Sequence, residues 1–146
     1  MQRTVVITGG NKGIGFAISE AFIASGYHVV IGSRSTDGLN KLKPGSFSHI
    51  EMDVRDERGH VALCEEALKK GDEVAAYVNN AGLSAWRPIG EIDDAFFDRL
   101  MNINLKGAFW GCKAAAAAMA NAGGSIINIS SMAAKRGSAN NAMYCA

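Results

Sequence analysis

Short apolar runs alternate with longer segments of helical periodicity in the first part of the chain. Residues 4–8 form a β-branched, largely apolar run, which is typical of a central parallel strand covered on both faces. Residues 15–25 then place apolar side chains at helical spacing, and the segment ends at Gly26, a residue type that often terminates helices. The pattern predicts a strand followed directly by a helix.

The same alternation continues to residue 129. Further strands are predicted at residues 27–31, 46–52, 74–78 and 125–129. Helices are predicted at residues 37–42, 56–70 and 93–120, of which the first is short and irregular. Strands that alternate with helices build βαβ units around a parallel sheet, so an α/β fold is predicted. In such a sheet a ligand binds beyond the carboxyl ends of the strands.

Composition and charge narrow the class of protein. The 146 residues are 48% hydrophobic and 20% charged, which suits one domain with a core over residues 1–146. A net charge of +1 with interspersed signs offers no face for nucleic acid, and no apolar run is long enough to span a membrane. Cys64, Cys112 and Cys145 form no CxxC pair, so we expect reduced thiols in a cytoplasmic protein, with neither disulfide nor metal site.

A glycine-rich turn joins the first predicted strand to the first helix. Glycines allow a tight turn and let the backbone approach a pyrophosphate, while free N–H groups at the helix start face its negative charge. An ordinary turn is the alternative, but the strand–turn–helix context favours dinucleotide binding. The residues expected to contact the cofactor here are Gly9, Asn11, Lys12, Gly13, Ile14 and Gly15.

These motifs resemble those of the short-chain dehydrogenase/reductase family. The segment TGGNKGIG at residues 8–15 is similar to the family's TGxxxGIG signature, and NNAG at residues 79–82 is similar to its motif after the fourth strand. Asp53, Asn104, Ser131 and Tyr144 follow in the family's order, so the resemblance covers nearly the whole chain. It implies a doubly wound parallel sheet, the Rossmann fold, that binds a nicotinamide dinucleotide.

Residues after the second predicted strand indicate which dinucleotide is preferred. NAD-preferring folds place an acid there for the ribose hydroxyls, whereas NADP-preferring folds offer an arginine. This chain has Ser33 and Arg34 there and no acid before Asp37, and Lys12 supplies a second cation. The alternative is that both cations are solvated surface charges. Two basic residues at these places favour NADP(H).

The resemblance also assigns residues to the adenosine half of the cofactor. Asp53 and Val54 follow the third predicted strand and match the family's adenine-contacting segment. Asp53 is equally suited to capping the next turn, and both roles can coexist. The Asn79-Asn80 pair either forms a simple turn at the strand end or, as the resemblance implies, stabilises the sheet edge, with backbone contact to the adenosine ribose from the segment that includes Asn80, Ala81 and Gly82.

The resemblance implies a catalytic set for carbonyl reduction. Tyr144 would donate the proton, Ser131 would hydrogen-bond the substrate oxygen, and Asn104 would help to position a water molecule. Ser130 is the alternative to Ser131, and Tyr144 is alternatively a packing residue at a helix start. The family's lysine four residues after the tyrosine lies beyond Ala146, where this sequence ends.

That ending leaves two explanations: a fragment of a longer enzyme, which we favour, or a natural short form without activity. The resemblance implies that C-terminal strands are missing from this chain and that the 146-residue chain alone shows little turnover. It also implies that the full-length protein is a homo-oligomer. Among relatives the motifs look most like those of 3-oxoacyl-[acyl-carrier-protein] reductases, and the substrate would be a small carbonyl compound or alcohol. A non-catalytic NADP(H)-binding sensor or scaffold is the rival hypothesis.

Overall fold

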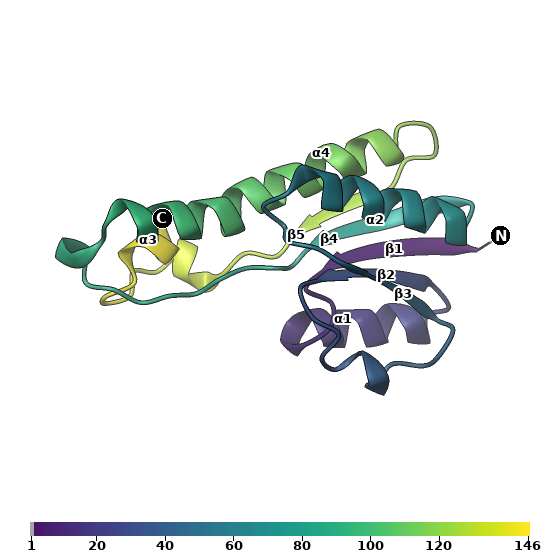
Figure 1. The fold of residues 1–146 in the computed structure, drawn as a ribbon, viewed down its shortest axis with the longest axis horizontal. Helices are drawn as coiled ribbons and strands as arrows, with labels where there is room; N and C mark the ends of the chain where they lie inside the picture. The colour runs from purple at the N-terminus through teal and green to yellow at the C-terminus, as the bar shows by residue number, and fades with distance from the viewer. Residues whose placement is uncertain (1) are drawn as a thin grey trace.

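The computed structural model describes residues 2–146, and its centre is one parallel β-sheet (Figure 1). The sheet has the strand order β3-β2-β1-β4-β5, and every neighbouring pair is parallel. The strands are β1 (Arg3–Thr8), β2 (His28–Ser33), β3 (Phe47–Glu51), β4 (Glu73–Asn79) and β5 (Ser125–Asn128). The order reverses between β1 and β4, which places a crevice beyond the carboxyl ends of these two strands.

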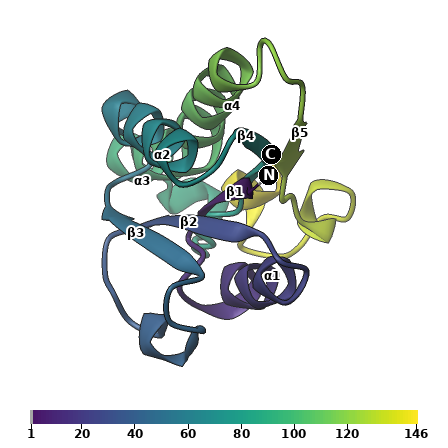
Figure 2. The same cartoon turned by 90° about the vertical axis from the view of Figure 1, so that its right-hand side faces the viewer.

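Helices cover both faces of the sheet (Figure 2). Helix α1 (Gly13–Ala24) packs on one face, and α2 (Glu57–Lys70) and α4 (Gly107–Ala118) pack on the other. The remaining helices are α3 (Asp94–Met101), α5 (Ala142–Cys145) and the 3-10 turns η1 (Leu39–Lys41), η2 (Ile89–Glu91) and η4 (Met132–Ala134). The predicted doubly wound α/β fold is therefore confirmed, with element ends shifted by up to a few residues.

Alternate side chains of the central strands build two cores, one on each face. Val5 and Ile7 of β1 are fully buried on the α1 side, in a core against which Phe22 of α1 also packs. Val6 lies between them in sequence and joins the core under α2 and α4, together with Tyr77 of β4. A strand that is apolar on both faces is what covering by helices on both sides requires.

The predicted helix at 93–120 is not one continuous α-helix. Helix α3 is followed by η3 (Asn102–Lys106), which is a π-helical turn, and then by α4. A π-turn inserts an extra residue into the helical register, and such turns are frequent at functional sites. Asn104 lies in this turn, and its side chain exchanges two hydrogen bonds with the backbone of Leu83.

Strand β5 is the edge strand at which the sheet ends in this chain. All four of its residues are exposed, including Ile126 and Ile127, whose side chains point to opposite faces. An apolar edge strand of this kind is normally paired or covered in a folded protein. In the part of the chain that the structure describes, the helices are all too short or too polar to cross a membrane.

Candidate functional site: a dinucleotide pocket

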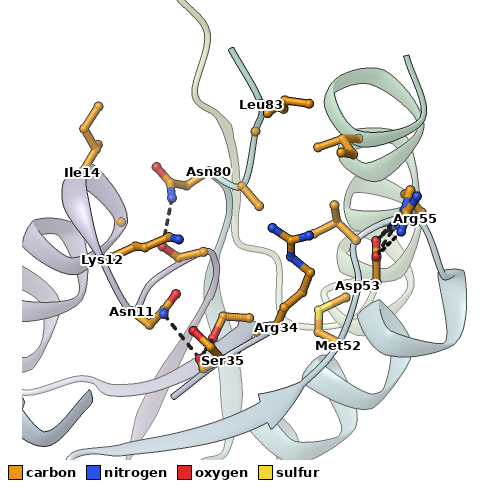
Figure 3. A pocket seen from close by; sticks show the side chains of 18 of the residues that line it. Asn11, Lys12, Ile14, Arg34, Ser35, Met52, Asp53, Arg55, Asn80 and Leu83 are labelled. Atoms are coloured by element: carbon orange, nitrogen blue, oxygen red, sulfur yellow. Dashed lines mark hydrogen bonds and ion pairs between the residues drawn. The ribbon is translucent and has the colours of Figure 1, made fainter. Parts of the chain in front are cut away.

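A pocket of about 600 Å³ lies beyond the carboxyl ends of β1 to β4 (Figure 3). Twelve of the thirteen predicted cofactor residues line it: Gly9, Asn11, Lys12, Ile14, Gly15, Ser33, Arg34, Asp53, Val54, Asn80, Ala81 and Gly82. The exception is Gly13, which begins α1 with a φ of 55° and lies outside the lining. The sequence motifs therefore converge on one cavity at the predicted place in the sheet.

The glycine turn packs too closely against β4 for any side chain at Gly15. A Cβ there would contact the Gly9 carbonyl oxygen and the Asn80 amide nitrogen at impossible distances. That amide Nδ2 donates to the Thr8 carbonyl at 3.0 Å, and the Thr8 hydroxyl accepts from the backbone N–H groups of Asn80 and Ala81 at 3.1 Å. The ends of β1 and β4 are tied together directly beneath the helix start.

Helix α1 presents its N-terminus to this pocket. Its N-cap residue, Lys12, makes no side-chain capping hydrogen bond, so the first N–H groups of the helix are not capped by that side chain. Uncapped N–H groups and the positive end of the helix dipole together favour an anion. The turn is thus suited to hold a pyrophosphate.

Two cations border the same pocket. Arg34 is exposed, and its side chain reaches into the cavity between the glycine turn and Asp53, while Lys12 lies on the glycine turn itself (Figure 3). Within residues 2–146 neither side chain takes part in an ion pair. Both charges are therefore available to an anionic ligand.

The loop after β2 is held in place by side chains that were expected to face the ligand. Ser33 Oγ donates to the Ser35 carbonyl at 2.7 Å, and Asn11 Nδ2 donates to the carbonyls of Ser35 and Asp37 at 3.3 and 3.1 Å. Because the only Ser33 hydroxyl hydrogen is used, His49 Nε2, 2.9 Å away, must carry the hydrogen of the second bond. Ser33 and Asn11 line the pocket, but their hydrogen bonds shape the loop that carries Arg34.

The segment after β3 contains an ion pair that the sequence analysis did not include. Arg55 donates from its guanidinium to both carboxylate oxygens of Asp53 at 2.6 to 3.1 Å, and its backbone N–H donates to Asp53 Oδ1 at 2.9 Å. These hydrogen bonds from Arg55 lower the pKa of Asp53, with a smaller contribution from the charge of Arg34. Asp53 thus caps its own turn and remains an ionised acceptor at the pocket wall.

Seven further residues line the pocket. Five of them flank the predicted residues, namely Gly32, Ser35, Met52, Arg55 and Leu83, and the other two, Arg99 and Ile103, lie on the long helical segment. The helical spacing predicted the helix, but the side of the helix that faces the pocket depends on how the π-turn rotates it. Only the Asp-x-Arg spacing of residues 53 and 55 was a usable signal, because residues two apart meet across a tight turn.

The three predicted catalytic residues lie outside the lining of this pocket. Ser131 is half-buried and caps η4, where its Oγ accepts from the backbone N–H of Ala133 at 3.2 Å, whereas Ser130 is exposed. Tyr144 lies on α5, which packs against η4 and against α3. Asn104 bonds the backbone of Leu83, a lining residue. The structure therefore places Ser131 and Tyr144 on adjacent elements and Asn104 at the pocket's wall.

Fold and pocket together define an α/β protein of the dinucleotide-binding class. A family model described as short chain dehydrogenase matches residues 3–146, so the chain belongs to that family, as the motifs indicated. It is 35% identical over 150 residues to a sorbitol dehydrogenase of Cereibacter sphaeroides, covering 99% of this chain and 58% of the relative. It is 33% identical over 147 residues to the 3-oxoacyl-[acyl-carrier-protein] reductase MabA of Mycobacterium bovis, covering 100% and 58%.

Solved structures give the same result. The structure described as ElxO with NADP bound superposes with a TM-score of 0.89 at 30% identity, covering 99% of this chain and 61% of that one. The chain thus spans about three fifths of the length of the proteins it matches.

Proposed function

We propose that this chain is the NADP(H)-binding part of an oxidoreductase that interconverts a carbonyl compound and an alcohol. The observation that carries the choice of NADP(H) is the pair of cations, Lys12 and Arg34, which border one pocket without ion-pair partners among residues 2–146. A planar guanidinium can bind a phosphate through two parallel hydrogen bonds, and a lysine adds a point charge. Ser33, in the place where an acid would favour NAD, supports the same choice.

The residues that line the pocket suit the pyrophosphate and the adenosine half of a dinucleotide. The glycine turn and the α1 N-terminus would hold the pyrophosphate, Arg34 and Lys12 the 2′-phosphate, and Asp53 with Val54 the adenine ring. The space that a Cβ at Gly15 would fill is already occupied by the Gly9 carbonyl and Asn80, so the backbone itself forms the floor. The ElxO structure, described as having NADP bound, supports this assignment by similarity.

The reaction needs a hydride, which the nicotinamide supplies when bound, and a proton at the substrate oxygen. By resemblance to the family, Tyr144 would hold that proton, Ser131 would orient the oxygen, and Asn104 would help to order a water molecule. The contact between α5 and η4 supports the first two roles because it brings their helices together. These roles, and an assembly of several copies, are proposals for the whole protein.

The substrate class is a small carbonyl compound or alcohol. The relatives named above act on quite different molecules by their descriptions, one on sorbitol and one on 3-oxoacyl groups carried by a protein. The motifs resemble those of the 3-oxoacyl reductases, and we propose a 3-oxoacyl thioester as the first substrate to assay.

Replacing Arg34 tests the proposed cofactor. In Arg34→Ala we expect NADPH affinity to fall by about tenfold to hundredfold, because charge-assisted hydrogen bonds to the 2′-phosphate are lost. NADH affinity should change by less than about threefold, because NADH has no phosphate there. Both are measured by calorimetric titration of the purified protein.

Arg58→Ala is the matched control, since Arg58 is an exposed arginine paired with Asp56 and lies outside the pocket lining. Equal losses for NADPH and NADH in Arg34→Ala, or a wild-type protein that binds NADH more tightly than NADPH, would contradict the proposal.

A further inference from the structure

Two fully buried polar side chains lie behind the wall of the pocket. His60 of α2 and Tyr77 of β4 are both 0% exposed, and His60 Nδ1 lies 2.8 Å from the Tyr77 hydroxyl. The other ring nitrogen, Nε2, lies 2.8 Å from the backbone carbonyl of Val54, which is a pocket-lining residue. The pair therefore connects β4, through α2, to the segment that follows β3.

The direction of each hydrogen bond follows from the partners. A carbonyl oxygen can only accept, so His60 Nε2 carries the hydrogen and donates to Val54. In the neutral ring Nδ1 then has a lone pair, and the Tyr77 O–H donates to it. Burial lowers the pKa of His60, which favours this neutral form. The Val54 carbonyl thus fixes the tautomer, and the hydrogen bond from Tyr77 holds the orientation of the ring that bonds Val54.

The peptide group between Val54 and Arg55 is held from both ends. His60 bonds its carbonyl at 2.8 Å, and Asp53 Oδ1 accepts from its N–H at 2.9 Å. The Val54 side chain is confined as well, since a Cβ added to Gly107 of α4 would lie 3.0 Å from it. The position of the Asp53 carboxylate is therefore tied, through one peptide group, to the imidazole of His60.

We propose that His60 and Tyr77 are positioning residues for the adenine ring. They fix the Asp53–Arg55 turn, so that the Asp53 carboxylate accepts a hydrogen bond from the adenine amino group. This inference rests on the proposed cofactor. Its consequence is a preference for adenine over hypoxanthine, whose carbonyl oxygen in place of the amino group would face a carboxylate. A buried pair that acted only on stability would leave that preference unchanged.

Tyr77→Phe removes the single oxygen atom that orients His60 and preserves the volume of the side chain. We expect NADPH to bind about threefold to tenfold more weakly, because a loosened imidazole no longer fixes the turn. Binding of nicotinamide hypoxanthine dinucleotide phosphate, reduced form, should weaken by less than about twofold, since it gains little from Asp53. The preference for adenine, measured as the ratio of the two dissociation constants by calorimetry, should therefore fall by nearly the same factor as NADPH affinity.

The matched control is Ser48→Ala, which removes a hydroxyl that lies 3.0 Å from His28 Nε2. Both residues lie near the amino ends of β2 and β3, away from the pocket, and neither lines it. The variant should leave the ratio unchanged. As a second pair, His60→Gln retains an N–H donor and an acceptor and should keep more of the preference than His60→Leu. Thermal melting of each variant confirms that it is folded.

Three results would overturn the inference: an unchanged ratio in Tyr77→Phe, full preference for adenine in His60→Leu, or equal binding of both nucleotides by the wild-type protein. Failure of the wild-type protein to bind either nucleotide would instead overturn the proposed function.

Discussion

At Gly15 the first helix packs tightly against the residues that follow β1 and β4. Its missing side chain is a packing requirement, because a Cβ would overlap the Gly9 carbonyl and the Asn80 amide. The Asn80 amide cannot retreat without losing its 3.0 Å bond to the Thr8 carbonyl. Close packing at this point therefore serves both the sheet and the proposed pyrophosphate site.

Gly15→Ala should consequently weaken stability and nucleotide binding together. We expect the free energy of unfolding to fall by about 1–3 kcal/mol, as for other overpacked buried sites. NADPH affinity should fall by more than about tenfold, because the added methyl group displaces the turn that faces the pyrophosphate. Urea denaturation and NADPH titration measure the two effects.

Gly90→Ala is the control for this prediction, because nothing lies within 4 Å of a Cβ at Gly90 and its φ is not positive. It should be neutral in both measurements. A Gly15→Ala variant with wild-type stability would show that the turn relaxes at no cost, and would contradict the packing argument.

The types of residue that follow the strands predicted most of the residues that line the pocket. The orientations of their side chains could be learned only from the structure. Arg34 and Lys12 were predicted because a basic residue in those two turns carries information by itself. Ser33 stands beside Arg34 in the segment that indicated NADP(H), and in the structure its hydroxyl donates to the Ser35 carbonyl and accepts from His49. That contact depends on the register of β2 against β3, which the local pattern of residues does not encode.

At the scale of elements, the π-turn η3 is joined to the loop after β4 by one side chain. Asn104 Nδ2 donates to the Leu83 carbonyl at 2.8 Å, and its Oδ1 accepts from the Leu83 N–H at 2.7 Å. The amide thus pairs with one residue as a neighbouring strand would. Because Leu83 lines the pocket, this contact places the helical segment relative to the cofactor site.

Asn104→Asp should break half of this pairing and strain the rest. A carboxylate can still accept from the Leu83 N–H, but its second oxygen would face the Leu83 carbonyl, which is repulsive. We expect the free energy of unfolding to fall by about 1–3 kcal/mol, together with faster hydrogen exchange at the Leu83 amide. Both are measurable by urea denaturation and NMR.

Asn102→Asp is the matched control, because Asn102 lies in the same turn and its side chain makes no hydrogen bond within residues 2–146. Equal destabilisation by both variants would mean that the added charge, rather than the Leu83 pairing, is responsible.

The π-turn also shows why helical periodicity predicted one helix over residues 93–120. The inserted residue shifts the apolar positions only once, and the pattern on either side of it stays helical, so periodicity alone predicts helix throughout the segment. The pairing of Asn104 with Leu83 joins residues 21 apart and is fixed by tertiary packing. The parallel sheet, by contrast, followed from the alternation of strands and helices, and its doubly wound form followed from the family resemblance.

At the scale of the whole molecule, the buried His60 and the half-buried His28 make stability depend on pH. Burial lowers the pKa of His60 below its ordinary value of 6.5, and burial followed by the charge of Lys70 lowers the pKa of His28. The unfolded chain therefore binds more protons than the folded chain just below pH 6.5. Stability from these groups is complete above pH 6.5 and is lost as the pH falls below it.

The carboxylate of Asp53 affects stability in a lower pH range than the histidines do. The hydrogen bonds from Arg55 lower the pKa of Asp53 below 3.8, so its contribution is retained above that pH and is lost only in stronger acid. A decrease in stability that begins near pH 6.5 therefore reports on the histidines and not on this ion pair.

Urea denaturation between about pH 7.5 and 4.5 should show this decrease, with a contribution from His60 of at most about 1.4 kcal/mol per pH unit. The His60→Gln side chain cannot titrate, so the slope of the unfolding free energy against pH should be smaller in that variant. Of the two histidines only His28 then contributes to it. An unchanged slope in that variant would mean that His60 is readily protonated in the folded chain. Such a result would be incompatible with an imidazole that accepts a hydrogen bond from Tyr77 while it donates to Val54.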